Sequence, residues 1–280
     1  MRIPPIFVLS LLAVVSIVAC GAFSDVEDDP GTTPQGGDAS TADTAPDPIT
    51  GVPRSPSDAA ADADDAGDSG DGGDAATCIK PASPPRVLFL NKGGGVYTGS
   101  ATADARVNTT PLVNADNTIN AWTPAGTTWA DILACVAYRL EPFNVEVTDV
   151  DPGSTKEHAE IVFAQASAPV LSGQPSVGPF TCTDVPNAIA FVSQTHASTA
   201  STGCSAALQL YGYSLGLESI YYGSGCADVM RYLYDSCPPG SFSKTPLPCG
   251  TTSTKTCTCG GGTTQVSFDK MIAVLGPRCL

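Results

Sequence analysis

One stretch of the chain, residues 209–219, holds residue types at a spacing that could do chemistry. Residues 212–216 read G-Y-S-L-G, a G-x-S-x-G pattern that places a nucleophilic serine, here Ser214, on a sharp turn between a strand and a helix. Such a serine needs an acid and then a histidine further along the chain. The two histidines, His158 and His196, both precede Ser214, and we expect them to be ordinary surface or loop residues. A Ser–acid–His triad in the usual order is therefore impossible, and we keep a serine hydrolase using Ser214 only as an alternative to the interpretation that follows.

The same stretch has the frame of a zinc-binding motif. In H-E-x-x-H-x-x-G-x-x-H, two histidines one helical turn apart bind the metal and the glutamate activates water. The glycine turns the chain so that a third histidine can bind. Gly216 keeps the glycine position. The remaining positions hold other residue types: Gln209 for the first histidine, Leu210 for the glutamate, Tyr213 for the second histidine and Ser219 for the third.

On these residues the chain resembles the metzincin zinc peptidases of exported bacterial proteins, with a degenerate zinc motif. Residues 144–153 are similar to the strand and turn that follow the first helix in that group. Residues 228–232, D-V-M-R-Y, resemble the Met-turn, which would place Met230 beneath the metal. The resemblance covers most of residues 85–280. It implies an α/β (α+β) fold with a metzincin-like mixed sheet, a long motif helix and a disulfide-rich C-terminal part.

The substituted side chains remove the chemistry of the motif. Gln209 offers a weakly donating amide oxygen, Ser219 offers a hydroxyl that rarely ionises, and Tyr213 offers a phenol with a pKa of about 10. Leu210 has no atom that could take a proton from attacking water. We therefore expect no bound metal and no cofactor, and a former site packed by Leu210, Tyr213 and Met230.

The N-terminal segment, residues 1–20, has the features of an export signal. Arg2 is followed by an apolar run, residues 6–18, that is too short to span a membrane comfortably. The segment ends in V-A-C-G, which resembles the lipobox of bacterial lipoproteins, in which Cys20 would be acylated. We expect an exported protein that is anchored to the membrane through Cys20 without spanning it. Gly21 favours the outer membrane by the same resemblance. An ordinary secretory signal is the alternative.

Residues 21–77 form an Asp-, Gly-, Ala- and Pro-rich linker. They hold 14 acidic residues and one basic residue, so most of the net charge of −15 comes from this stretch. Such a composition buries too little apolar surface to offset the entropy of ordering, and predicts a disordered segment. Charge of a single negative sign also argues against nucleic acid as a partner.

Residues 78–280 are long enough for one folded domain with a sizeable core. Apolar runs and alternation predict strands at 86–91, 145–150, 159–164 and 188–192. Apolar residues at helical spacing predict helices at 127–143, 204–215 and 266–275.

Without an acylated Cys20, the eleven cysteines leave an even number, which in an exported chain predicts disulfides. The ten candidates are Cys78, Cys135, Cys182, Cys204, Cys226, Cys237, Cys249, Cys257, Cys259 and Cys279. Spacing alone does not determine the pairing. Proximity and the resemblance, which includes the cysteine-rich tail, favour Cys78–Cys135, Cys182–Cys204 and Cys226–Cys237, with the last four pairing among themselves. A zinc knuckle formed by Cys249, Cys257 and Cys259 is the alternative, but the tail has no second C-x-x-C pair to complete it.

Three classes of function follow. The first, which we favour, is a membrane-anchored pseudoenzyme whose peptidase-like cleft binds a peptide or protein, because extended peptides can bind along a sheet edge without a metal. The second is an active hydrolase, either a zinc peptidase with an unforeseen site or a serine hydrolase using Ser214. The third is a structural envelope protein without a specific ligand.

Overall fold

A five-stranded mixed sheet forms the centre of the domain in the computed structural model, which describes residues 83–232 and 237–278. Four of its strands are parallel and one edge strand, β7, is antiparallel. The strand order is β5 (Val145–Thr148), β1 (Arg86–Asn91), β6 (Ala159–Ala164), β8 (Ile189–Ser193) and β7 (Ser176–Val177). The inner strands β6 and β8 are buried along their whole length, as expected for parallel strands that are covered on both faces.

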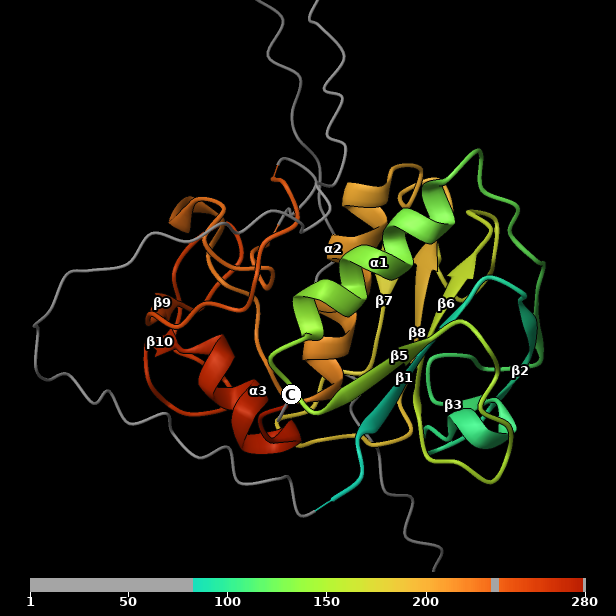
Figure 1. Ribbon diagram of the computed structural model, residues 1–280, viewed down its shortest axis with the longest axis horizontal. Coiled ribbons are helices and arrows are strands. Elements are labelled where there is room, and N and C mark those ends of the chain that lie inside the picture. The colour runs from blue at the N-terminus through green and yellow to red at the C-terminus, as the bar shows by residue number, and fades with distance from the viewer. Residues whose placement is uncertain (1–82, 233–236, 279–280) are drawn as a thin grey trace, which may run out of the picture. The chain divides into compact units, whose positions relative to one another are not determined.

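Two helices, α1 (Thr128–Leu140) and α2 (Ala200–Ser214), cover one face of this sheet, where Figure 1 shows them side by side. Their apolar residues share a core with the strand side chains that point to the same face. Thr199 caps α2 by accepting a hydrogen bond from the Thr202 amide at 3.2 Å. The Cys135–Cys204 disulfide joins the two helices.

A small sheet covers the opposite face of the main sheet. Its strand order is β3 (Thr109–Thr110), β2 (Gly95–Gly99) and β4 (Asn117–Ile119), and a 3-10 helix, η1 (Ala105–Val107), lies beside it. Tyr97 of β2 is fully buried and packs edge-to-face on Phe191 of β8, with ring centroids 5.2 Å apart. A second hydrophobic core therefore lies between the two sheets.

The C-terminal part is irregular and rich in cystine. It contains η2 (Tyr222–Ser224), the strand pair β9 (Leu247–Pro248) and β10 (Thr264–Gln265), and α3 (Ser267–Leu275). Three disulfides, Cys226–Cys237, Cys249–Cys257 and Cys182–Cys259, fasten this part. The α/β class, the mixed sheet and the disulfide-rich C-terminal part are confirmed.

Two of the expected disulfide pairings, Cys78–Cys135 and Cys182–Cys204, are wrong. Cys135 pairs with Cys204, because α1 and α2 pack against each other. Cys182 pairs with Cys259, 77 residues later, so the last four cysteines do not pair only among themselves. The Cys226–Cys237 pairing is confirmed. Cys78 and Cys279 lie outside the described residues, as do the expected signal segment with Cys20 and the linker at 21–77.

The described residues bear on the cellular location through their disulfides and their helices. Their disulfide-rich fold is consistent with a location outside the cytoplasm. Within that part of the chain, no helix has the length and apolar character needed to cross a bilayer.

Candidate functional site

The candidate site begins where α2 ends and the chain turns back at Gly216. The Gly216 amide donates to the Tyr213 carbonyl at 3.1 Å, and the Leu217 amide donates to the Gly212 carbonyl at 3.0 Å. Gly216 has a φ of +82°, and an added Cβ would lie 3.0 Å from the Cys182 carbonyl oxygen. Glycine is therefore required here both by its left-handed backbone and by the close approach of a neighbouring segment.

This turn brings two of the motif positions into direct contact. The Tyr213 hydroxyl lies 2.7 Å from Ser219 Oγ, and either hydroxyl can donate. Gln209, one helical turn before Tyr213, is 5% exposed and donates from Nε2 to the Arg231 carbonyl at 2.9 Å. Leu210 is buried in the main core. The polar groups of Gln209, Tyr213 and Ser219 thus bond to protein atoms.

The segment around Met230 lies directly against the motif helix. Met230 is fully buried, and its Sδ occupies the space that a Cβ on Gly212 would need. Asp228 holds this turn, since its carboxylate accepts hydrogen bonds from the Met230 amide at 2.7 Å and the Ser243 amide at 2.9 Å. Burial raises the pKa of Asp228. The Ile220 amide donates to the Met230 carbonyl at 2.8 Å, which ties the turn to the residue after Ser219.

An edge segment, residues 178–182, follows β7 and lies along α2. An added Cβ on Gly178 would lie 2.9 Å from Leu210 Cδ2, and the Phe180 ring packs edge-to-face on Tyr213 at 6.0 Å between centroids. Cys182 then reaches Gly216, as described above. Phe180 is 42% exposed, so an accessible aromatic ring lies beside the Tyr213–Ser219 pair.

Ser214 is not on a nucleophile turn. It is the last residue of α2 and is 2% exposed, and its hydroxyl donates to the Tyr211 carbonyl at 2.7 Å. A nucleophilic serine of the G-x-S-x-G type would instead lie exposed between a strand and a helix. The structure therefore gives no support to the serine-hydrolase interpretation.

Both histidines lie outside the helix that carries Ser214. His158 lies in the loop before β6, as expected, but it is buried there because its ring packs on Phe89 and its Nδ1 lies 2.8 Å from the Lys156 carbonyl oxygen. His196 lies in the loop before α2, as expected, where it lines a small hollow with Ser193 and Thr195. That loop is at the opposite end of α2 from Ser214.

The residues at the motif positions do not fit zinc. An amide, a phenol and an aliphatic hydroxyl are poor ligands at neutral pH, and here each is engaged in a hydrogen bond with the protein. A second cluster, Glu218, Cys249 and Cys257, has ligand atoms within 4.8 Å of one another. Its two sulfur atoms are bonded to each other, whereas zinc binds cysteine as thiolate.

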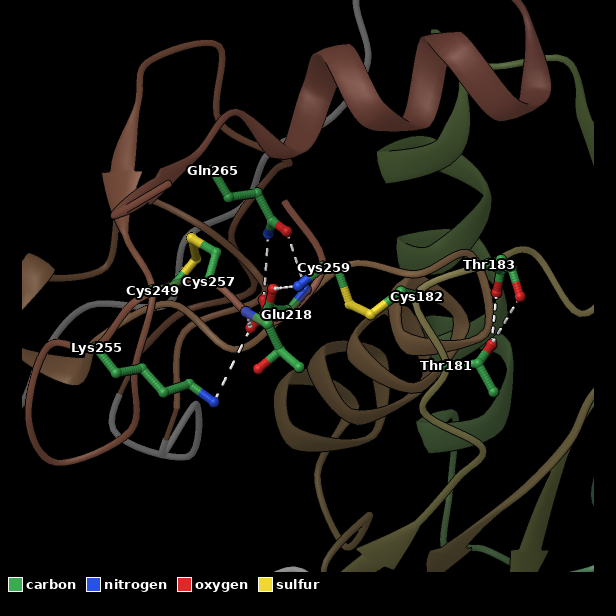
Figure 2. Close-up of a disulfide and its surroundings, with 10 residues drawn as sticks. Thr181, Cys182, Thr183, Glu218, Cys249, Lys255, Cys257, Cys259 and Gln265 are labelled. Carbon is green, nitrogen blue, oxygen red and sulfur yellow. Dashed lines mark hydrogen bonds and ion pairs between the residues drawn. A yellow bond between two sulfur atoms is a disulfide. The ribbon is translucent and has the colours of Figure 1, made fainter. Parts of the chain in front are cut away.

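Glu218 is the residue at this site that the sequence did not single out. Its side chain is 1% exposed, yet the carboxylate accepts hydrogen bonds from the Thr258 amide at 2.8 Å and the Cys259 amide at 2.6 Å. Lys255 Nζ lies 3.9 Å from the same carboxylate. Figure 2 shows Glu218 between the Cys249–Cys257 and Cys182–Cys259 disulfides, which both hold the tail loop, residues 249–259, with Gln265 beside it. The only sequence signal was a lone acidic residue inside the motif frame.

No protein-family model matches the chain, and none of the curated proteins matches it. The geometry of the site is therefore the main guide to its function.

Proposed function

We propose that this chain is an exported, lipid-anchored protein whose metzincin-like domain is catalytically inactive and binds an extended peptide or a peptide segment of a protein. Three features support the proposal: the residues at the motif positions, the course of the edge segment along α2, and the free edge of β7. Nucleic acid is not the proposed partner, because the folded domain carries no excess of basic residues.

The observation that carries the proposal is the Tyr213–Ser219 hydrogen bond. Two residues that replace the second and third histidines of the motif meet at 2.7 Å after a turn at Gly216. That is the geometry expected of a scaffold that once brought two ligands to one ion. The position of the catalytic glutamate holds the buried Leu210, so no general base is available there.

A peptide could bind at the edge of the sheet. Among the described residues, β7 is an edge strand that pairs with β8 alone, and the Ser193 amide donates to the Pro175 carbonyl at 2.8 Å. Since residues 175 and 177 thus face β8, the alternation of an antiparallel ladder turns the backbone N–H and C=O of Ser176 toward the free edge. An extended peptide can pair with such groups, while Phe180 offers an apolar contact.

A peptide-binding screen on the purified chain tests this function. A library of extended peptides should yield binders, and Ser176→Pro should weaken the selected peptide about tenfold because it removes the outward-facing N–H. Ser176→Ala removes only the side-chain hydroxyl and serves as the matched control. Equal affinity in the Ser176→Pro and Ser176→Ala variants, or the absence of any binder, would contradict the proposal.

The inactive state and the anchor have separate tests. The wild-type chain should cleave no peptide in the library, and a chelator should make no difference to that result. Mass spectrometry of the mature N-terminus should find Cys20 acylated, and Cys20→Ser should release the chain from the membrane fraction. Chelator-sensitive cleavage would instead indicate an active metallopeptidase.

A further inference from the structure

The Cys182–Cys259 disulfide connects two walls of the candidate site. Cys182 ends the edge segment, which contacts Leu210, Tyr213 and Gly216. Cys259 lies 77 residues further along the chain, in the tail loop. Figure 2 shows this bridge next to Glu218, the residue immediately before Ser219. One covalent bond therefore fixes the relative positions of the two chain segments that flank the Tyr213–Ser219 pair.

Glu218 carries the constraint from the tail loop to Ser219. The amide of Cys259 itself donates to Glu218 Oε1, and the Thr258 amide donates to Oε2. Gln265 holds the main chain of Glu218 from the other side: the Glu218 amide donates to Gln265 Oε1 at 2.9 Å, and Gln265 Nε2 donates to the Glu218 carbonyl at 3.2 Å. Movement of the loop at 257–259 would therefore move the backbone that presents Ser219.

The bridge is open to attack from solvent. Cys182 is exposed and Cys259 is half-buried, whereas Cys249 and Cys257, which form the other bridge of the tail loop, are 0% and 5% exposed. In the bridge between α1 and α2, Cys204 is 0% exposed and Cys135 is half-buried. Thiol–disulfide exchange requires access of the attacking thiolate to a sulfur atom. A dithiol can thus reach the exposed Cys182 more readily than either cysteine of the Cys249–Cys257 bridge.

We propose that the Cys182–Cys259 disulfide is a redox-controlled fastening of the candidate site, that is, a cross-link opened by a dithiol reductant and closed again by the reverse exchange with a disulfide, which takes up the two electrons. A thiolate of the reductant bonds to Cys182 Sγ, and the Cys182–Cys259 bond breaks as Cys259 leaves as a thiolate and takes a proton from water. The second thiol of the reductant then attacks the mixed disulfide and releases Cys182, also as a thiol. Two electrons pass to the protein, and the dithiol becomes a disulfide.

Opening has a defined consequence for the site. The edge segment loses its covalent tie to the tail loop, and Glu218 keeps its hydrogen bonds to that loop and its ion pair with Lys255. The walls of the site then become mobile, so a peptide must order them when it binds, which lowers its affinity. This consequence rests on the proposed peptide-binding function, but the loosening itself can be measured without any peptide.

Hydrogen exchange on the purified chain tests the fastening directly. The chain is reduced with dithiothreitol under native conditions, the freed Cys182 and Cys259 are alkylated with iodoacetamide, and hydrogen exchange is then measured. Amides at 178–183, 216–219 and 257–259 should exchange about tenfold faster than in the untreated chain. The double variant Cys182→Ser/Cys259→Ser should behave the same way in the absence of reductant. Cys226→Ser/Cys237→Ser removes another surface bridge, one that does not join these walls, and should leave exchange at 216–219 unchanged.

The outcomes separate the fastening from the proposed function. Unchanged exchange at 216–219, with Cys182 and Cys259 shown to be alkylated, overturns the fastening even if a peptide still binds. Faster exchange together with about tenfold weaker peptide binding supports both proposals. Faster exchange with no peptide bound in either redox state supports the fastening and contradicts the proposed function. If the double variant does not fold, the reduced wild-type chain gives the same test.

Discussion

Tyr213 and Ser219 meet hydroxyl to hydroxyl at 2.7 Å, although a helix end and a glycine turn separate them along the chain. Their contact shows that the turn at Gly216 returns the chain to the helix that it has just left.

The turn at Gly216 should tolerate no side chain. We expect Gly216→Ala to lower the free energy of unfolding by about 2 kcal/mol or more, because alanine is disfavoured at positive φ and its Cβ would press on the Cys182 carbonyl. Gly153 has a similar φ, +78°, with no atom within 4 Å of an added Cβ. Gly153→Ala therefore measures the backbone cost alone, by urea denaturation. Equal losses in both variants would mean that the contact with Cys182 contributes nothing.

The Tyr213–Ser219 hydrogen bond should contribute modestly to stability. Removing the hydroxyl in Tyr213→Phe should cost about 1 kcal/mol, the usual net value of such a bond. Ser219→Ala should cost a similar amount, and the double variant should cost less than the sum of the two. Tyr138, which is 66% exposed, provides the control Tyr138→Phe, for which we expect no change. Strictly additive losses would contradict an interaction between the two hydroxyls.

The second core contains a buried carboxyl group that should make stability depend on pH. Glu160 Oε1 accepts hydrogen bonds from Asn91 Nδ2 at 2.7 Å and from the Tyr97 hydroxyl at 2.8 Å, while Oε2 has no partner among the described residues. Burial raises the pKa of Glu160 from 4.5 to about 7. The folded state therefore binds a proton more tightly than the unfolded state. The resulting stabilisation is complete below pH 4.5 and is lost as the pH rises through 7.

Urea denaturation at two pH values measures this effect. The free energy of unfolding should be higher at pH 5 than at pH 8 by about 2 to 3 kcal/mol from Glu160 alone. Glu160→Gln keeps an oxygen acceptor but does not titrate, so its stability should change less over the same range. Buried Asp228, whose pKa is also raised, contributes in the same direction in both proteins and cancels in the comparison. The same pH dependence in wild type and variant would exclude Glu160 as a source.

The Cys135–Cys204 disulfide between the two helices should contribute more to the free energy of unfolding than the Cys226–Cys237 disulfide in the C-terminal part. Cys135–Cys204 spans 69 residues and Cys226–Cys237 spans 11. In the chain-entropy model, loops of these lengths contribute about 4 and about 3 kcal/mol. Replacing each pair by serine and measuring the unfolding midpoint should give that order of losses. A larger loss for the Cys226–Cys237 pair would show that native packing, rather than loop length, determines the contribution.

The elements that position the site were predictable where a strong local pattern exists. The strands at 86–91 and 159–164 lie at the predicted positions, and the motif helix lies within a few residues of its predicted bounds. The small sheet of β2, β3 and β4 was missed, because its strands are two to five residues long and have no apolar run of their own. β7 was missed for the same reason, although it borders the site.

Contacts between distant segments could not be derived from local pattern. The Cys182–Cys259 pairing depends on the edge segment lying along α2 and on the tail loop reaching the same place. Glu218 shows the same limit, since its importance comes from two amide groups about 40 residues further along the chain. The burial of His158 likewise depends on contact with Phe89 of another strand.

The central proposal is that positions 209, 213 and 219 lie where three ligands of one metal ion would lie, although their present side chains do not fit a metal. The triple variant Gln209→His/Tyr213→His/Ser219→His tests it, with zinc per chain measured by elemental analysis of the purified protein. We expect about one zinc per chain in the variant and none in stoichiometric amount in the wild type. A folded triple variant that binds no zinc, or a wild-type chain that carries one zinc, would contradict the claim.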